Sequence, residues 1–161
     1  MADITTYQGT VYPGRCDQMG HMNVMWYAAK FDEASWTFLS LMGVHVAYLR
    51  EAGRRMAAAR QTICYLKELF AGNVIMVNTT LDHIGTKSLR FTHKMYRHGE
   101  TEPVAISELV GVHLDAATRR GCEFPASLRS RLFAFLDQSA NGSGGRTEQV
   151  LDTELRNGTL G

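Results

Sequence analysis

The sequence predicts a single α+β domain in which an antiparallel five-stranded sheet wraps around one long buried helix. Three observations predict it: five segments with strand-like patterns, one long apolar stretch of helical character, and a length that suits one domain. The chain has 161 residues, of which 45% are hydrophobic. A domain of this size buries enough surface to fold without disulfides or a structural metal.

The strand segments alternate apolar and polar residues between turn residues. The alternation is most regular over residues 88–97, where polar side chains separate Leu89, Phe91 and His93. On the last strand, Glu108 interrupts the apolar face. The expected strands are residues 4–12, 56–66, 74–82, 88–97 and 104–114. One curved sheet leaves an edge strand exposed, which predicts a homodimer or homotetramer.

The helix predicted over residues 24–42 contains only three charged residues. Its apolar residues extend around most of the cylinder, which is typical of a helix buried on all sides. Asn23 is the expected N-cap and Gly43 suits the position after the C-terminus. Residues 44–55 form a helical turn or a loop, and residues 125–136 form a short amphipathic helix.

The composition changes after this last helix, where glycine and polar residues dominate. Such a composition is typical of a flexible linker, expected from Gln138 to Arg146, and of a polar tail. We therefore expect a folded domain over residues 1–138 and a flexible segment over residues 139–161.

Charge and cysteine content exclude several classes of protein. The 17 Lys and Arg residues nearly balance 16 Asp and Glu residues, so the net charge of +1 argues against a nucleic-acid-binding protein. Cys16, Cys64 and Cys122 lie far apart without zinc-site spacing, which predicts reduced thiols, a cytoplasmic location and no metal. No apolar run is long enough to span a membrane, and the first residues do not resemble a signal peptide.

The loop before the long helix holds the residues best suited to chemistry. Asp17 precedes a helix N-terminus, whose N–H groups and dipole can hold a developing oxyanion, so the loop suits acyl transfer. Alternatively, Asp17 and Asn23 only cap the helix. Two other hypotheses are a Cys16 nucleophile with His21 as its base, and a metal hydrolase using Asp17, His21 and His45.

Residues 14–20, Gly-Arg-Cys-Asp-Gln-Met-Gly, resemble the G-x-C-D-x-x-G loop of the 4-hydroxybenzoyl-CoA thioesterase family, which has the hot-dog fold. Residues 20–23, Gly-His-Met-Asn, followed by Tyr27 and Glu33, resemble a wider pattern of that superfamily. Shorter matches near residues 65–69, 87–90 and 119–125 are similar to the betainyl-CoA thioesterase-like branch. The resemblance covers residues 7–136 and implies an acyl-CoA thioesterase without a cofactor.

The resemblance also implies roles for single residues. Asp17 is the carboxylate that attacks the thioester carbonyl or activates a water, and the Val24 backbone N–H polarises that carbonyl. His21 and Asn23 shape the loop or orient water. The turn that would meet the CoA nucleotide is formed by Thr86, Lys87 and Ser88.

Four other residues are candidates for binding the acyl group. Trp26, Tyr27 and Tyr65 are either core residues or walls of an acyl pocket, where their rings would attract a quaternary ammonium. Glu108 is a partner at a dimer interface, a countercharge in such a pocket, or a strand-end residue that faces water.

The resemblance therefore implies hydrolysis of an acyl-CoA at a site between two protomers, and the crowded, aromatic start of the helix favours a small acyl group, polar or cationic. Whether Asp17 acts as nucleophile or base stays open. A hydratase or dehydratase of the same fold carries a His/Asp or His/Glu pair in a different motif, which this sequence lacks. A non-catalytic acyl-CoA-binding module would lack Asp17.

Overall fold

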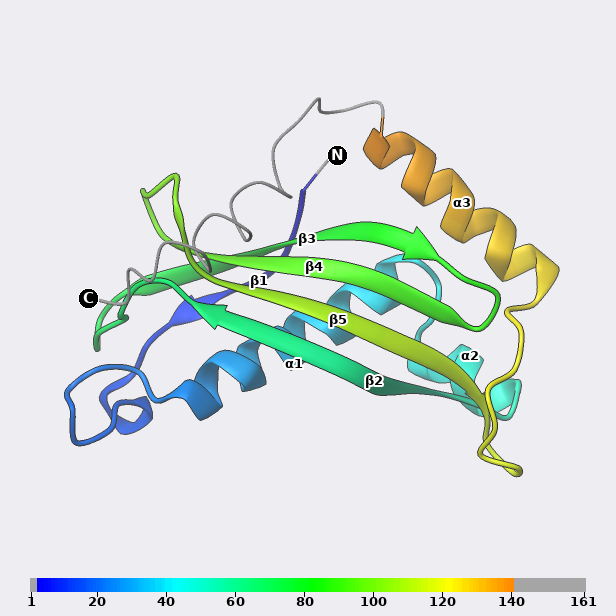
Figure 1. Ribbon diagram of the computed structural model, residues 1–161, viewed down its shortest axis with the longest axis horizontal. Helices are drawn as coiled ribbons and strands as arrows, with labels where there is room; N and C mark the ends of the chain where they lie inside the picture. Colours follow the sequence, from blue (N-terminus) through cyan, green and yellow to red (C-terminus); the bar gives the residue numbers. More distant parts are fainter. Residues whose placement is uncertain (1–2, 141–161) are drawn as a thin grey trace.

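The computed structural model describes residues 3–140, and it confirms the predicted sheet and long helix (Figure 1). The strands are β1 (Ile4–Thr10), β2 (Arg54–Tyr65), β3 (Val74–Ile84), β4 (Ser88–Arg97) and β5 (Pro103–Asp115). The helices are a 3-10 turn η1 (Pro13–Arg15), α1 (Val24–Leu41), α2 (Val46–Glu51) and α3 (Ala126–Ala140). Neighbouring strands are antiparallel in the order β1-β3-β4-β5-β2.

Helix α1 packs against the inner face of the sheet through one stripe of side chains. Phe31 stacks on His93 of β4 with 5.7 Å between ring centroids, and Phe38 contacts Phe91 at 5.5 Å. The expected burial on all sides is wrong for the single chain, because one face of α1 is turned to solvent. The large apolar residues at least 40% exposed on α1 are Val24, Met25, Trp36 and Leu41.

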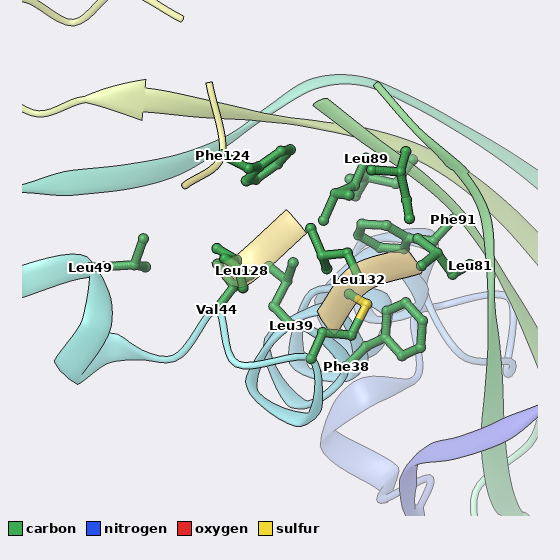
Figure 2. Packing of buried hydrophobic residues seen from close by; sticks show 13 residues of the cluster. Phe38, Leu39, Val44, Leu49, Leu81, Leu89, Phe91, Phe124, Leu128 and Leu132 are labelled. Atoms are coloured by element: carbon green, nitrogen blue, oxygen red, sulfur yellow. The ribbon is translucent and has the colours of Figure 1, made fainter. Parts of the chain in front are cut away.

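Helix α3 closes the core at the C-terminal end of α1. Leu128 and Leu132 pack with Phe38 and with Leu81 of β3, as Figure 2 shows. Strand β1 pairs with β3 only as far as Thr79, and α3 contacts β3 as well. The fold therefore closes its core with a helix beyond the end of the short edge strand.

The predicted linker begins too early. Helix α3 continues to Ala140, so residues 138–140 are helical rather than part of a flexible segment. The rest of the predicted linker and the polar tail, residues 141–161, lie outside the described residues. The boundary after residue 138 thus falls within a helix.

Strand β5 turns its more apolar face away from α1. Leu109 pairs with Phe91, and both face the helix, whereas Glu108 pairs with Thr92 on the outer face. Glu108 is half-buried there. Burial of the Asp82 carboxyl raises its pKa, and the nearby negative charge of Glu108 raises it further. Glu108 therefore does not line the side of the sheet that faces α1. Its neighbours on the outer face include Val110 and Val112.

A chain of polar side chains crosses the core behind α1. His93 is fully buried, with Nε2 2.8 Å from the Ser35 hydroxyl and Nδ1 2.6 Å from the Thr79 hydroxyl. Thr79 in turn lies 2.7 Å from the hydroxyl of Thr6 on β1. Burial lowers the pKa of His93 to about 3, so this histidine is a core residue with both ring nitrogens hydrogen-bonded, and it is neutral at pH 7.

Because His93 is neutral when folded, the protein should lose stability as the pH falls below 6.5, the ordinary pKa of histidine. The unfolded chain then binds a proton that the folded chain excludes, down to a pH of about 3. This costs up to about 1.4 kcal/mol per pH unit. Urea unfolding between about pH 7 and pH 4 measures it. His93→Gln should be less sensitive to pH, and equal pH slopes for both proteins would contradict this expectation.

Candidate active site

The loop between η1 and α1 is anchored to the segment that follows β2. The Met22 amide donates a hydrogen bond to the Leu69 carbonyl at 2.6 Å. Within the loop, the Gly20 amide donates to the Asp17 carbonyl at 3.0 Å and closes a turn. Gly20 has a φ of +86°, a conformation that glycine adopts without a steric cost. The backbone therefore fixes where the Asp17 side chain leaves the chain.

Asn23 links the Asp17 carboxylate to the start of α1. Its Oδ1 accepts a hydrogen bond from the Met25 amide at 3.0 Å, which makes it the predicted N-cap. Its Nδ2 donates to Oδ2 of Asp17 at 3.1 Å, and the Met19 amide donates to Oδ1 at 2.9 Å. Asp17 accepts no amide of α1, so the hypothesis that it caps the helix is wrong.

The backbone N–H of Val24 is the first donor of α1. Asn23 accepts hydrogen bonds from the two amides that follow Val24. The Met25 amide donates to its side chain, and the Trp26 amide donates to its carbonyl at 2.9 Å. Within residues 3–140, the Val24 amide has no acceptor. A free N–H at the positive end of a helix dipole is suited to a developing oxyanion.

His21 lies at the rim of the loop and pairs with neither Cys16 nor a metal-type cluster. Its Nε2 is 3.6 Å from the Glu68 carboxylate, an ion pair when the imidazole is protonated. His45 caps α2 instead, through Nδ1 and the Tyr48 amide at 3.2 Å. Over the described part of the chain, no three His, Cys, Asp or Glu residues are placed to hold a metal ion. The geometry therefore does not support the cysteine and metal hypotheses.

The predicted aromatic residues divide into two groups. Tyr27 is buried, donates from its hydroxyl to the Lys67 carbonyl at 3.3 Å, and meets Tyr65 edge-on with centroids 5.2 Å apart. Burial raises the pKa of Tyr27 to about 12, so its phenol stays protonated. Trp26 lies against Arg15, whose guanidinium carbon is 5.1 Å from its ring centroid. A cation of the chain itself therefore already lies over the Trp26 ring.

The predicted CoA-binding turn lies far from Asp17 within one chain. Thr86 and Lys87 are exposed in the turn between β3 and β4, and Ser88 begins β4. Figure 1 shows this turn at the right end of the sheet, and the loop before α1 at the left end. The 11 residues of β3 separate the two ends, about 36 Å at the usual rise of a strand. One chain therefore does not bring Asp17 and Lys87 together.

A pocket that the sequence analysis missed lies between α1 and the β2–β5 side of the sheet. Its volume is about 50 Å³. The lining residues are Asp32, Ser35, Trp36, Leu39, Met56, Ala57, Ala58, Phe91, Leu109 and Gly111. The available signal was the pair Asp32 and Trp36, four residues apart on one helix face. This pair was not recognised as part of a pocket, because the helix was expected to be buried on all sides.

A profile of the thioesterase-like superfamily matches residues 11–132. The chain belongs to this superfamily. The predicted thioesterase family is thereby confirmed, whereas the role of each site residue stays a prediction.

Two relatives of this chain have named activities. The betainyl-CoA thioesterase of Pseudomonas aeruginosa is 24% identical over 134 residues, 83% of this chain and 84% of that protein. The chloroplastic acyl-acyl carrier protein thioesterase of Arabidopsis thaliana is 25% identical over 122 residues, 76% of this chain. The match spans 64% of the Arabidopsis protein, less than two thirds of its length.

Solved structures confirm the hot-dog fold. A Staphylococcus aureus protein solved in complex with CoA has a TM-score of 0.83 at 19% identity, covering 93% of this chain and 94% of the other. A DHNA-CoA thioesterase from the same species has a TM-score of 0.76 at 13% identity, covering 86% and 95%. No helix within residues 3–140 has the length and apolar character needed to cross a membrane.

Asn23 variants separate its two contacts. Asn23→Ala should lower the free energy of unfolding by about 1 kcal/mol, because the Met25 amide loses its cap. Asn23→Ser keeps a capping oxygen but no N–H for Asp17, so its stability should stay within about 0.5 kcal/mol of the parent. Urea unfolding measures both. Equal losses in the two variants would show that the cap is not what Asn23 contributes.

Proposed function

We propose that this protein is an acyl-CoA thioesterase that hydrolyses a small acyl-CoA to CoA and a carboxylate. The observation that carries the proposal is the Asp17 carboxylate, held by the side chain of Asn23, the residue that directly precedes the free amide of Val24. A base or nucleophile and an oxyanion donor at one point are the two groups that thioester hydrolysis needs. The family and the names of its relatives support the same reaction.

In the proposed reaction, the thioester oxygen accepts a hydrogen bond from the Val24 N–H. Asp17 either takes a proton from the attacking water or attacks the carbonyl carbon itself, in which case water then hydrolyses the anhydride. The C–S bond breaks, and the CoA thiolate leaves and takes up a proton. The positive end of the α1 dipole stabilises the oxyanion that forms before this bond breaks.

We propose that the complete site needs a second copy of the chain. Strand β2 is a 12-residue edge strand, and most of its side chains are exposed. Antiparallel pairing of two β2 strands about a two-fold axis would set Arg54 of one copy near Tyr65 of the other. The CoA-binding turn of one copy would then approach the Asp17 loop of the other, which one chain alone does not achieve.

The acyl group is proposed to be small and polar, with a betainyl group as the first candidate. The match to a betainyl-CoA thioesterase and the small volume of the pocket beside α1 support this choice. Trp26 is a weaker candidate for binding a cationic acyl group, because the Arg15 guanidinium already lies over the face of its ring. Tyr27 and Tyr65 stay candidate walls.

A second candidate is hydration of an unsaturated acyl thioester in the same fold. The observation that favours it is the His21–Glu68 pair, 3.6 Å apart at the rim of the loop. A thioesterase releases free thiol, whereas a hydratase removes the absorbance of the conjugated thioester without releasing thiol. Both signals recorded on crotonyl-CoA separate the two candidates.

Asp17→Asn should lower thioester hydrolysis at least about 100-fold, because an amide is neither a base nor a competent nucleophile. Thiol release from acetyl-, betainyl- and palmitoyl-CoA measures the loss, and calorimetry with CoA should give an unchanged affinity. Asp137→Asn, the same change at an exposed position on α3, is the control. Near-normal turnover of folded Asp17→Asn protein would exclude Asp17 as the catalytic carboxylate.

The oligomeric state provides an independent prediction. Light scattering at micromolar concentration should give at least twice the 18.0 kDa mass of one chain, since the β2 edge is long and unpaired. A proline in β2, such as Thr62→Pro, should shift the mass towards the monomer and lower activity together. A fully active 18.0 kDa monomer would contradict the shared site.

A further inference from the structure

We infer that the pocket between α1 and β2 binds the acyl head group, and that Asp32 and Trp36 make it selective for a cationic group such as a quaternary ammonium. This inference rests on the proposed thioesterase function and adds the location and the charge preference of the acyl pocket. It assigns recognition to residues outside the loop that holds Asp17.

The pocket is formed by one helix face and the inner face of the sheet. Asp32, Ser35 and Trp36 are three and four residues apart, so their side chains lie together on α1. Phe91 and Gly111 lie on the sheet side. A Cβ at Gly111 would be 3.2 Å from Cε of Met56 and 3.9 Å from Phe91, so the glycine keeps this part of the pocket open.

The lining of the pocket carries a single formal charge, which is negative. Asp32 is exposed and has no ion-pair partner among residues 3–140, whereas the adjacent Glu33 pairs with Lys30 at 2.8 Å. The Ser35 hydroxyl is occupied by His93 and by the Phe31 carbonyl, both at 2.8 Å. Asp32 therefore supplies the charge that a ligand in the pocket would meet.

Trp36 supplies the aromatic surface that suits a quaternary ammonium. Its side chain is 40% exposed beside the pocket, so its ring is accessible. A cation without N–H groups cannot donate ordinary hydrogen bonds, and it is recognised by aromatic faces and by a nearby carboxylate. Trp26 is a poorer candidate, because the Arg15 guanidinium already lies over it and would repel a second cation.

The position of the pocket indicates that its ligand reacts at the Asp17 of a second copy of the chain. Asp32 comes eight residues after Val24, about 12 Å along the helix. A short acyl group cannot bridge that distance within one chain. Pairing of two β2 strands would bring the Asp17 loop of a second copy towards Met56 and Ala58, two of the residues that line the pocket.

The test compares betainyl-CoA with tert-butylacetyl-CoA, which has the same shape without the charge. The wild-type kcat/KM should favour betainyl-CoA by at least about fivefold, and Asp32→Asn should remove most of this preference. Trp36→Leu should also lower the ratio, and Trp36→Phe should retain more of it. Glu51→Gln removes an exposed carboxylate from α2 and is the control, with an unchanged ratio.

Each outcome either supports or overturns the inference. A preference for the neutral substrate, or a ratio unchanged by Asp32→Asn, would overturn the acyl pocket while the thioesterase function stands. If no acyl-CoA of the panel is hydrolysed, the proposed function fails together with the inference. Because Asp32 is exposed, its variant should fold, and its unfolding temperature confirms this.

Discussion

The packing of one face of α1 against the inner face of the sheet is the interaction on which the rest of the structure depends. Phe31 and Phe38 are fully buried against β4, and they fix the helix along the strands. The N-terminus of α1 is thereby set at one end of the sheet, beside Asp17. The same packing leaves the side of the helix next to β2 partly open, where Asp32 and Trp36 line a pocket.

This arrangement places the candidate catalytic groups and the predicted CoA-binding turn at opposite ends of the sheet. Asp17 and the Val24 amide lie at one end of the sheet, whereas Lys87 lies in the turn at the other end (Figure 1). The buried residues of the strands between them form the core, so the fold itself holds these two groups apart. A second copy paired through β2 is therefore the simplest arrangement that completes the proposed site, and it would also satisfy an exposed sheet edge.

Local patterns in the sequence predict most of the fold, because strands and caps depend on neighbouring residues. The bounds of β4 and the start of α1 after Asn23 are as predicted. Burial is less predictable, because an apolar residue such as Trp36 has the same pattern whether it faces a core or solvent. Alternation divides β5 into two faces without telling which one meets α1, so the side of the sheet on which Glu108 lies was not predictable. The pocket depends on contacts between segments far apart in the chain.

The most direct test of the shared site mixes two inactive variants. Asp17→Asn lacks the carboxylate, and Gly111→Leu fills the pocket. If one copy supplies Asp17 and the other the pocket, co-refolding equal amounts should restore about a quarter of wild-type activity. This is because half of the dimers are mixed and each holds one intact site. Activity of Gly111→Leu alone, or no recovery on mixing although mixed dimers form, would contradict the account.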